Sequence, residues 1–155
     1  MILENFRQLK NVDFDITEVL THCQSWKDGQ SFSYLETPRP DHGLYFLQSG
    51  KASYQLDDGS FLFATAGEVM FQPQGSIYKV VCYAVDGTLP CALLINFKLP
   101  NIQLPKKITR IAKDDGSIAR RFSEIIDLYR QSAFSLMKAK LYETMELLTS
   151  ETNDP

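Results

Sequence analysis

The sequence is poor in the residues that build metal and disulfide sites. It contains two histidines and three cysteines among 155 residues, and Cys23, Cys82 and Cys91 are widely spaced with no C-x-x-C pair. An odd number of scattered cysteines argues against a disulfide framework or a zinc knuckle. The pattern favours reduced thiols in a cytoplasmic protein.

Long apolar runs and an excess of positive charge are also missing. No run approaches the ~20 residues that a membrane-spanning helix needs, and the first ten residues, MILENFRQLK, lack the apolar segment of a signal peptide. The net charge is −3, without the basic stripe that phosphate contacts require. We therefore expect a soluble domain that contacts neither a membrane nor, through this chain, DNA.

The sequence does contain a series of short β-rich runs between residues 16 and 100. About eight runs of alternating or β-branched residues are separated by turn residues, among them the pairs Asp58-Gly59 and Asp86-Gly87. Asp-Gly pairs between alternating runs indicate hairpins, because glycine accepts a positive φ without strain. The spacing predicts a mainly β domain, an antiparallel sandwich or barrel.

The pattern changes at Pro100. Residues 101–116, with Pro105 among them, are expected to form a connector, and residues 1–15 an N-terminal arm. After Ser117 the apolar residues recur at helical spacing, with a break near Gln131-Ser132, so residues 117–150 are expected to form a helical hairpin. Residues 151–155 are expected to be a tail or the start of a linker.

The two expected helices have different apolar stripes. The first stripe, expected to pack on the barrel, is Ile118, Phe122, Ile125 and Tyr129. The second stripe either packs on the barrel as well or pairs with a second copy of the chain, which gives a homodimer. Its members after Phe134 are the dimerisation candidates Met137, Leu141, Met145 and Leu148.

One stretch, AGEVMFQPQGSIYKVV, is similar to the second motif of the cupin superfamily, G-x5-P-x-G-x2-H-x3-N. Gly67, Pro73 and Gly75 match, whereas Tyr78 stands at the histidine position and Cys82 at the asparagine. The resemblance implies a cupin-type antiparallel jelly-roll barrel. When the first cupin motif is anchored on Gly50, its other ligand positions fall on Thr37, Arg39 and Gly43.

This set of side chains does not suit a metal ion. A cupin metal needs converging imidazoles and a carboxylate, and an arginine stays protonated and repels a cation. Neither His22 nor His42 falls on a ligand position, so each is interpreted as a surface or hydrogen-bonded residue. No metal and no other cofactor is expected, and a metal-dependent cupin enzyme is the weakest of the alternatives.

A metal-free cupin barrel followed by a helix pair resembles the N-terminal ligand-sensing domain of AraC-type bacterial transcription regulators. The resemblance is carried by the runs RPDHGLYFLQSGKASYQL, AGEVMFQPQGSIYKV and LLINFKLP, in that order. It implies a small-molecule effector, a dimerisation helix, and DNA binding by a separate helix-turn-helix domain that this chain does not contain. We expect the chain to be part of a longer regulator, with a natural stand-alone sensor as the alternative.

Strand periodicity then predicts which side chains line the barrel. Thr37 and Arg39 are expected to point inward, with Tyr45 and Leu47 on the next strand. On the two later strands, Tyr78, Val80 and Cys82 share a face, as do Ala92, Leu94 and Asn96. The predicted ligand-binding residues are Arg39, Tyr45, Tyr78, Val80, Leu94 and Asn96.

These residues favour a sugar or an organic acid as the effector, because the guanidinium fork binds carboxylates or vicinal hydroxyls and the two phenols can stack on a ring. In the family the N-terminal arm closes over the ligand, and Phe6 and Phe14 are candidate lid anchors here. The alternative is an interaction or dimerisation module with an inert, filled barrel. In that case Tyr78 only fills volume, and Arg39 pairs with Asp41 or Glu36. No catalytic residue is predicted, so the chain is not expected to be an enzyme.

Overall fold

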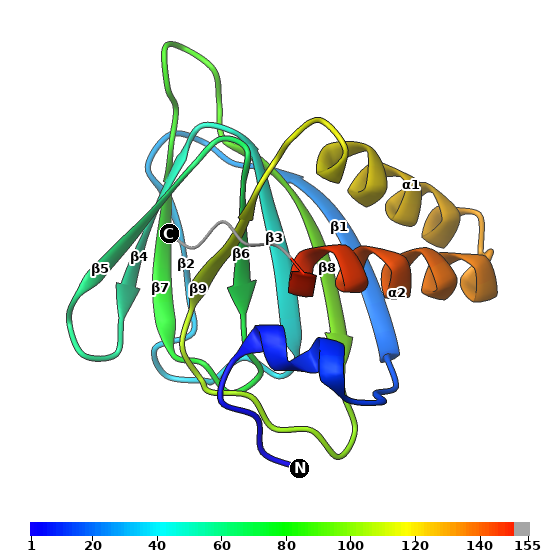
Figure 1. Cartoon of the computed structure of the whole chain (residues 1–155). Helices are drawn as coiled ribbons and strands as arrows, with labels where there is room; N and C mark the ends of the chain where they lie inside the picture. The colour runs from blue at the N-terminus through cyan, green and yellow to red at the C-terminus, as the bar shows by residue number, and fades with distance from the viewer. Residues whose placement is uncertain (151–155) are drawn as a thin grey trace.

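Nine strands form two antiparallel sheets that pack face to face in the computed structural model, which describes residues 1–150 (Figure 1). The five-stranded sheet has the order β1-β8-β3-β6-β9 and the four-stranded sheet the order β2-β7-β4-β5. The strands are β1 Thr17–Ser25, β2 Gln30–Ser33, β3 His42–Ser49, β4 Lys51–Leu56, β5 Phe61–Thr65, β6 Glu68–Gln72, β7 Tyr78–Tyr83, β8 Cys91–Lys98 and β9 Thr109–Lys113. The prediction of a cupin-type β domain is confirmed.

Strand β3 is central, and its sequence shows why. From His42 to Leu47 every residue is buried, because one face of the strand meets the four-stranded sheet and the other lies beneath the helices. Tyr45 and Leu47 belong to the core between the sheets, whereas Leu44 and Phe46 belong to the core under the helices. A strand buried on both faces needs a continuous apolar run, and this one provides it.

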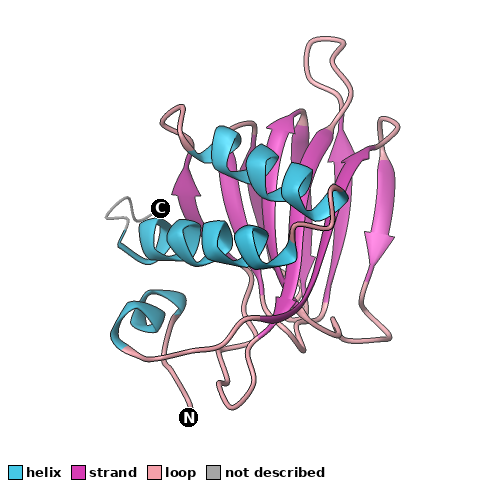
Figure 2. Cartoon of the chain, turned by 90° about the vertical axis from the view of Figure 1, so that its right-hand side faces the viewer, coloured by secondary structure: helices cyan, strands magenta, loops and turns pink. Residues whose placement is uncertain are grey.

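Two helices, α1 Ile118–Arg130 and α2 Phe134–Ser150, cover the outer face of the five-stranded sheet (Figure 2). Phe122 of α1 contacts Phe46 of β3, with ring centroids 5.6 Å apart. The break predicted near Gln131-Ser132 falls between the helices, and Ser132 takes a positive φ of 58° there. Neither α-helix of residues 1–150 has the length and apolar character needed to span a bilayer.

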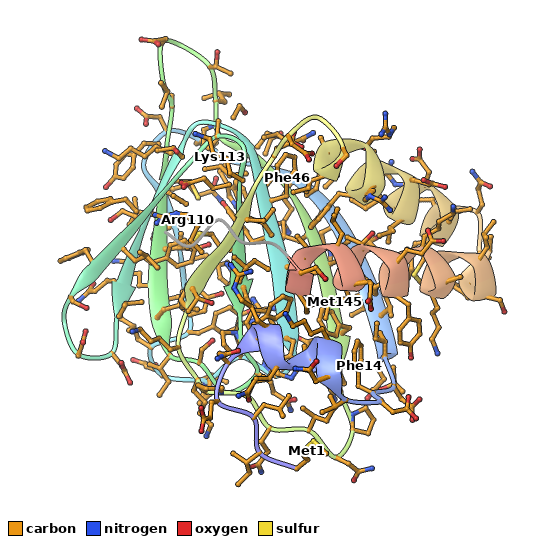
Figure 3. The ribbon with its side chains drawn as sticks, viewed as in Figure 1. Met1, Phe14, Phe46, Arg110, Lys113 and Met145 are labelled. Carbon is orange, nitrogen blue, oxygen red and sulfur yellow. The ribbon has the colours of Figure 1, made fainter. Side chains whose placement is uncertain are left out.

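The predicted dimerisation stripe packs within the protomer, which is the first of the two arrangements expected from the sequence. The four side chains are at most 2% exposed, and they join the core formed with the sheet, α1 and the N-terminal segment. Figure 3 labels Met145 on α2, and this side chain is fully buried. These atoms are therefore not available to a second copy in this conformation. They are Met137, Leu141, Met145 and Leu148.

The arm and the connector are also more ordered than the sequence suggested. The arm contains a 3-10 helix, η1 Phe6–Asn11, whose Phe6 and Leu9 are buried. Phe6 packs on Phe71 and Phe14 on Tyr142 of α2, so both aromatic rings anchor the arm to the core. The connector contributes β9, an edge strand paired with β6. The expected tail, residues 151–155, lies outside the described residues.

We predict that Met145→Ala lowers the free energy of unfolding by about 2–5 kcal/mol, because it leaves a cavity between α2 and the sheet. Leu136→Ala on the same helix is the matched control, since Leu136 is 52% exposed and its loss should cost under about 0.5 kcal/mol. Urea unfolding of both variants measures the difference. If Met145→Ala leaves monomer stability intact and only shifts a dimer equilibrium, the intramolecular assignment is wrong.

Candidate functional site at the base of the barrel

Arg39 closes one end of the space between the sheets. Its guanidinium donates from Nη1 to Gln72 Oε1 at 2.9 Å and to Tyr78 Oη at 3.0 Å, and from Nη2 to Asn96 Oδ1 at 2.8 Å. Nε donates to the Asp41 backbone carbonyl at 3.1 Å, and the Asp41 carboxylate lies 3.5 Å from Nη2. Four hydrogen bonds and one ion pair therefore offset the cost of burying this cation.

Gly43 provides the space that this arrangement needs. A Cβ at this position would lie 2.7 Å from Arg39 Nη2 and 2.9 Å from Asn96 Oδ1, both inside van der Waals contact. Gly43 pairs with Gln72 on one side and with Asn96 on the other, so all three strands meet the guanidinium at one level. The backbone of β3 at Gly43 therefore packs directly against the Arg39–Asn96 hydrogen bond.

Aromatic rings fill the barrel above Arg39. Tyr54 contacts Tyr45 and Tyr78 with ring centroids 6.2 and 5.5 Å apart, and Tyr54 accepts a hydrogen bond from Gln72 Nε2 at 2.7 Å. Burial raises the pKa of Tyr78 to about 12 although the Arg39 charge opposes it, so the phenol that accepts from Arg39 is neutral at pH 7. Burial also raises the pKa of the Cys82 thiol.

The structure places five of the six predicted ligand-binding residues among these buried groups. Tyr45, Tyr78, Val80 and Leu94 are at most 9% exposed in the core between the sheets, and Arg39 is 4% exposed. Asn96 is partly buried and holds the guanidinium. Thr37 is exposed, so its predicted inward orientation is wrong; it lies in the loop between β2 and β3, where strand alternation does not apply.

Three of the four positions that align with cupin metal ligands, Arg39, Gly43 and Tyr78, belong to the Arg39 network. Gly43 lies below the guanidinium and Tyr78 accepts a hydrogen bond from it. Within residues 1–150, no three His, Cys, Asp or Glu side chains gather in a way that could hold a metal ion. Of the alternatives weighed for Arg39, pairing with Asp41 is the one that the structure shows.

A cleft of about 1000 Å³ lies outside the barrel at the Arg39 end. We call it the basal cleft; it is bounded by the start of β1, the end of β8, the 99–104 loop, the Gln74–Gly75 turn and the first two residues. Figure 3 shows Met1 at this end of the molecule. The cleft has three basic side chains, Arg39, Lys98 and Lys106, and one acidic side chain, Glu18, which lies 3.4 Å from Lys98 Nζ.

The remaining walls of the basal cleft combine apolar and polar residues. The apolar ones are Met1, Ile2, Pro40, Leu99, Pro100, Ile102 and Leu104, and the polar ones are Thr17, His42, Gln74, Asn101 and Gln103. The N-terminal residues are held at the rim by backbone hydrogen bonds, from Leu3 N to Gln103 O at 3.0 Å and from Gln103 N to Met1 O at 2.9 Å. Cationic groups beside an apolar trough suit a ligand with an anionic head and an apolar body.

His42 is a cleft residue that the sequence did not point to. It is the first residue of β3, it is 2% exposed, and its ring lies 5.5 Å from Phe71 and 5.8 Å from Phe97. Burial, and then the Arg39 charge, lower the pKa of His42 to about 4. No cupin motif marks this position, and a signal would have required knowing that the outer side of β3 meets a cleft.

Comparison with known proteins shows the fold. A scan against protein-family models and a search of curated proteins find no match. Among solved structures, apo ToxT K231A from Vibrio cholerae strain SCE256 superposes with a TM-score of 0.59 at 13% identity, over 90% of this chain and 60% of that chain. ToxT from Vibrio cholerae O395 gives 0.55 at 8% identity, over 83% and 54%.

The chain therefore spans about 60% or less of the ToxT length. The structural neighbours are the N-terminal ligand-binding domain of ToxT, an AraC-family regulator, and cupin-superfamily proteins. One of the latter is from Desulfitobacterium hafniense, with a TM-score of 0.42 and 19% identity over 58% of this chain and 87% of that one. The superposition on ToxT shows that the two chains share a fold.

We predict that Gly43→Ala destabilises the protein by about 1–3 kcal/mol, because the new methyl group displaces a guanidinium that is held on several sides. The φ angle at Gly43 is not in the left-handed region, so the cost is steric and not conformational. A double-mutant cycle with Arg39→Ala measures the coupling between the two positions by urea unfolding. Additive effects would contradict the role assigned to Gly43.

We predict a pH dependence of stability from His42. The pKa of His42 is about 4 in the folded protein against 6.5 for the free side chain. Above pH 6.5 the ring is therefore neutral in both the folded and the unfolded state, and the protein has its full stability as far as this group is concerned. The free energy of unfolding decreases by up to about 3 kcal/mol as the pH falls from 6.5 toward 4, because the unfolded chain binds the proton first. The difference in unfolding free energy between wild type and His42→Asn, measured across this range, isolates the histidine. A difference that does not change with pH would refute the assignment.

Proposed function

We propose that the chain is the effector-binding domain of a transcription regulator, and that its effector is a small organic acid with an apolar body bound in the basal cleft. The observation that carries this proposal is the pairing of Arg39, Lys98 and Lys106 with aliphatic walls in one cleft. A carboxylate gains charge-assisted hydrogen bonds from such cations, and a hydrocarbon body gains from leaving water. No catalytic step is proposed.

An acid fits the basal cleft better than a sugar does. Each buried sugar hydroxyl needs its own hydrogen-bond partner, and the seven apolar residues of the cleft wall offer none through their side chains. The two phenols that were candidates for stacking on a sugar, Tyr45 and Tyr78, are at most 2% exposed. ToxT, which has this fold, has also been solved with an unsaturated fatty acid bound. An amphipathic acid is therefore the class of ligand to test first.

The first residues of the chain are the element through which binding would be transmitted. Met1 and Ile2 line the cleft, and residues 6–14 continue into contacts with the core and with α2. A ligand that contacts Ile2 favours the conformation in which this segment is held against the 99–104 loop. Regulation requires that the acid binds this conformation more tightly than another. DNA binding by a separate helix-turn-helix domain, and a homodimer, are further parts of the proposal.

A second candidate is an interaction module with an inert barrel. It is favoured by the Arg39 guanidinium, which already has four hydrogen bonds and an ion pair without any ligand. In this case the barrel is a support and the basal cleft binds no acid. The experiment below separates the two candidates.

We predict that decanoate binds the protein and that decanol, its neutral counterpart, binds more weakly. The double variant Lys98→Gln and Lys106→Gln should weaken decanoate at least about tenfold, because it removes two charges near the carboxylate. Isothermal titration calorimetry measures both. Lys113→Gln is the control, since this exposed lysine ends β9 near the opposite end of the barrel (Figure 3). A protein that binds no member of a C6–C18 carboxylate series favours the inert module.

A further inference from the structure

His42 lies at the junction between the Arg39 network and the apolar part of the basal cleft. It immediately precedes Gly43, whose backbone supports the guanidinium, and its own ring lies beside Phe71 and Phe97 of the core under the helices. The ring is packed near Phe71 and Phe97, which holds its plane. His42 is also among the residues that line the cleft.

The hydrogen bonds of His42 define which nitrogen carries the proton. Nδ1 accepts the backbone N–H of Gln74 at 2.9 Å, so a neutral ring must carry its hydrogen on Nε2. The ring is neutral at pH 7, because burial and Arg39 lower its pKa. Gln74 thus fixes both the tautomer and the orientation of the ring.

The Nε2–H donor has no partner. This atom is buried, and it makes no hydrogen bond to any of residues 1–150. A buried donor without an acceptor has lost its hydrogen bond to water without a replacement, and buried side-chain donors in folded proteins are usually paired. The unpaired donor lies on a residue that lines the cleft proposed to bind an acid, so an oxygen atom of that acid is a suitable acceptor.

We propose that His42 is a specificity-determining residue whose Nε2–H donates a hydrogen bond to an oxygen of the acid bound in the basal cleft. The inference rests on the proposed function and adds to it a neutral donor beside the cationic groups. A neutral donor can form a hydrogen bond with an acceptor oxygen whether or not the ligand is charged. Decanamide, whose carbonyl accepts but carries no charge, should therefore keep a His42-dependent part of the affinity.

Two substitutions separate the roles of the two nitrogens. In His42→Asn the Oδ1 atom can replace Nδ1 as the acceptor for Gln74, but the distant donor is lost. In His42→Gln the side-chain amide can replace Nε2–H, but the acceptor for Gln74 is lost. If the role of His42 is purely structural, only its contact with Gln74 matters, and the asparagine variant should resemble the wild type more closely in ligand affinity. A ligand-binding histidine makes the glutamine variant the better binder.

Calorimetry with decanoate and with decanamide tests the proposal. We expect His42→Asn to weaken both probes about tenfold and His42→Gln to weaken them less than about threefold, since one hydrogen bond is lost only in the first case. Thermal unfolding of the unliganded variants shows whether each is folded. Affinities of His42→Asn equal to those of wild type overturn the proposal.

The same histidine can be observed directly in the wild-type protein, which removes any dependence on the variants' folding. Long-range ¹H–¹⁵N spectra of the labelled protein identify the Nε2–H tautomer, and added decanoate should shift the Nε2–H resonance downfield and slow its exchange with water. An unchanged resonance at saturating decanoate overturns the proposal but leaves the acid-binding function in place if the Lys98 and Lys106 variant has lost affinity. No binding of decanoate to wild type overturns both.

Discussion

The buried guanidinium of Arg39 is the interaction on which the rest of the structure depends. It ties β3, β6, β7 and β8 together through Gly43, Gln72, Tyr78 and Asn96, and so joins the two sheets at one end. Removing any one acceptor would leave part of a buried cation unsatisfied, which costs more than the lost bond is worth. The glycine on β3 is required by the same constraint, because a side chain there would occupy the space of the guanidinium.

The Arg39 network separates the interior of the barrel from the basal cleft, two spaces that could not be distinguished from the sequence. Above Arg39 the barrel is filled by tyrosines that contact one another, so the interior contributes stability. Below it, outside the barrel, the basal cleft is open and contains Lys98, Lys106 and the aliphatic 99–104 loop. His42 is next to both, because burial and then the Arg39 charge lower its pKa and the residue also lines the cleft. The proposed ligand site therefore lies at the end of the barrel and not within it.

Local patterns were sufficient to predict most of the fold. Strand alternation and turn residues located eight strands, and helical periodicity located α1 and α2 on either side of Ser132. Local patterns could not predict β9, which pairs with β6, or η1, which packs on Phe71, because both contacts are long-range and leave no local signal. It also could not decide what α2 buries, since Met145 is equally apolar against a sheet or a second copy. For the site, alternation placed Tyr45 and Tyr78 inside, but the cleft is assembled from loops and the ends of strands, and alternation does not predict that these segments meet.

The most direct test of this account is a crystal structure of the protein in complex with decanoate. The account predicts that the carboxylate lies in the basal cleft near Lys98, Lys106 and His42, with the hydrocarbon chain against the 99–104 loop and Ile2 and with the tyrosine core unchanged. Decanoate found between the sheets, with Tyr45 and Tyr78 moved apart and the hydrogen bonds of Arg39 broken, would contradict it.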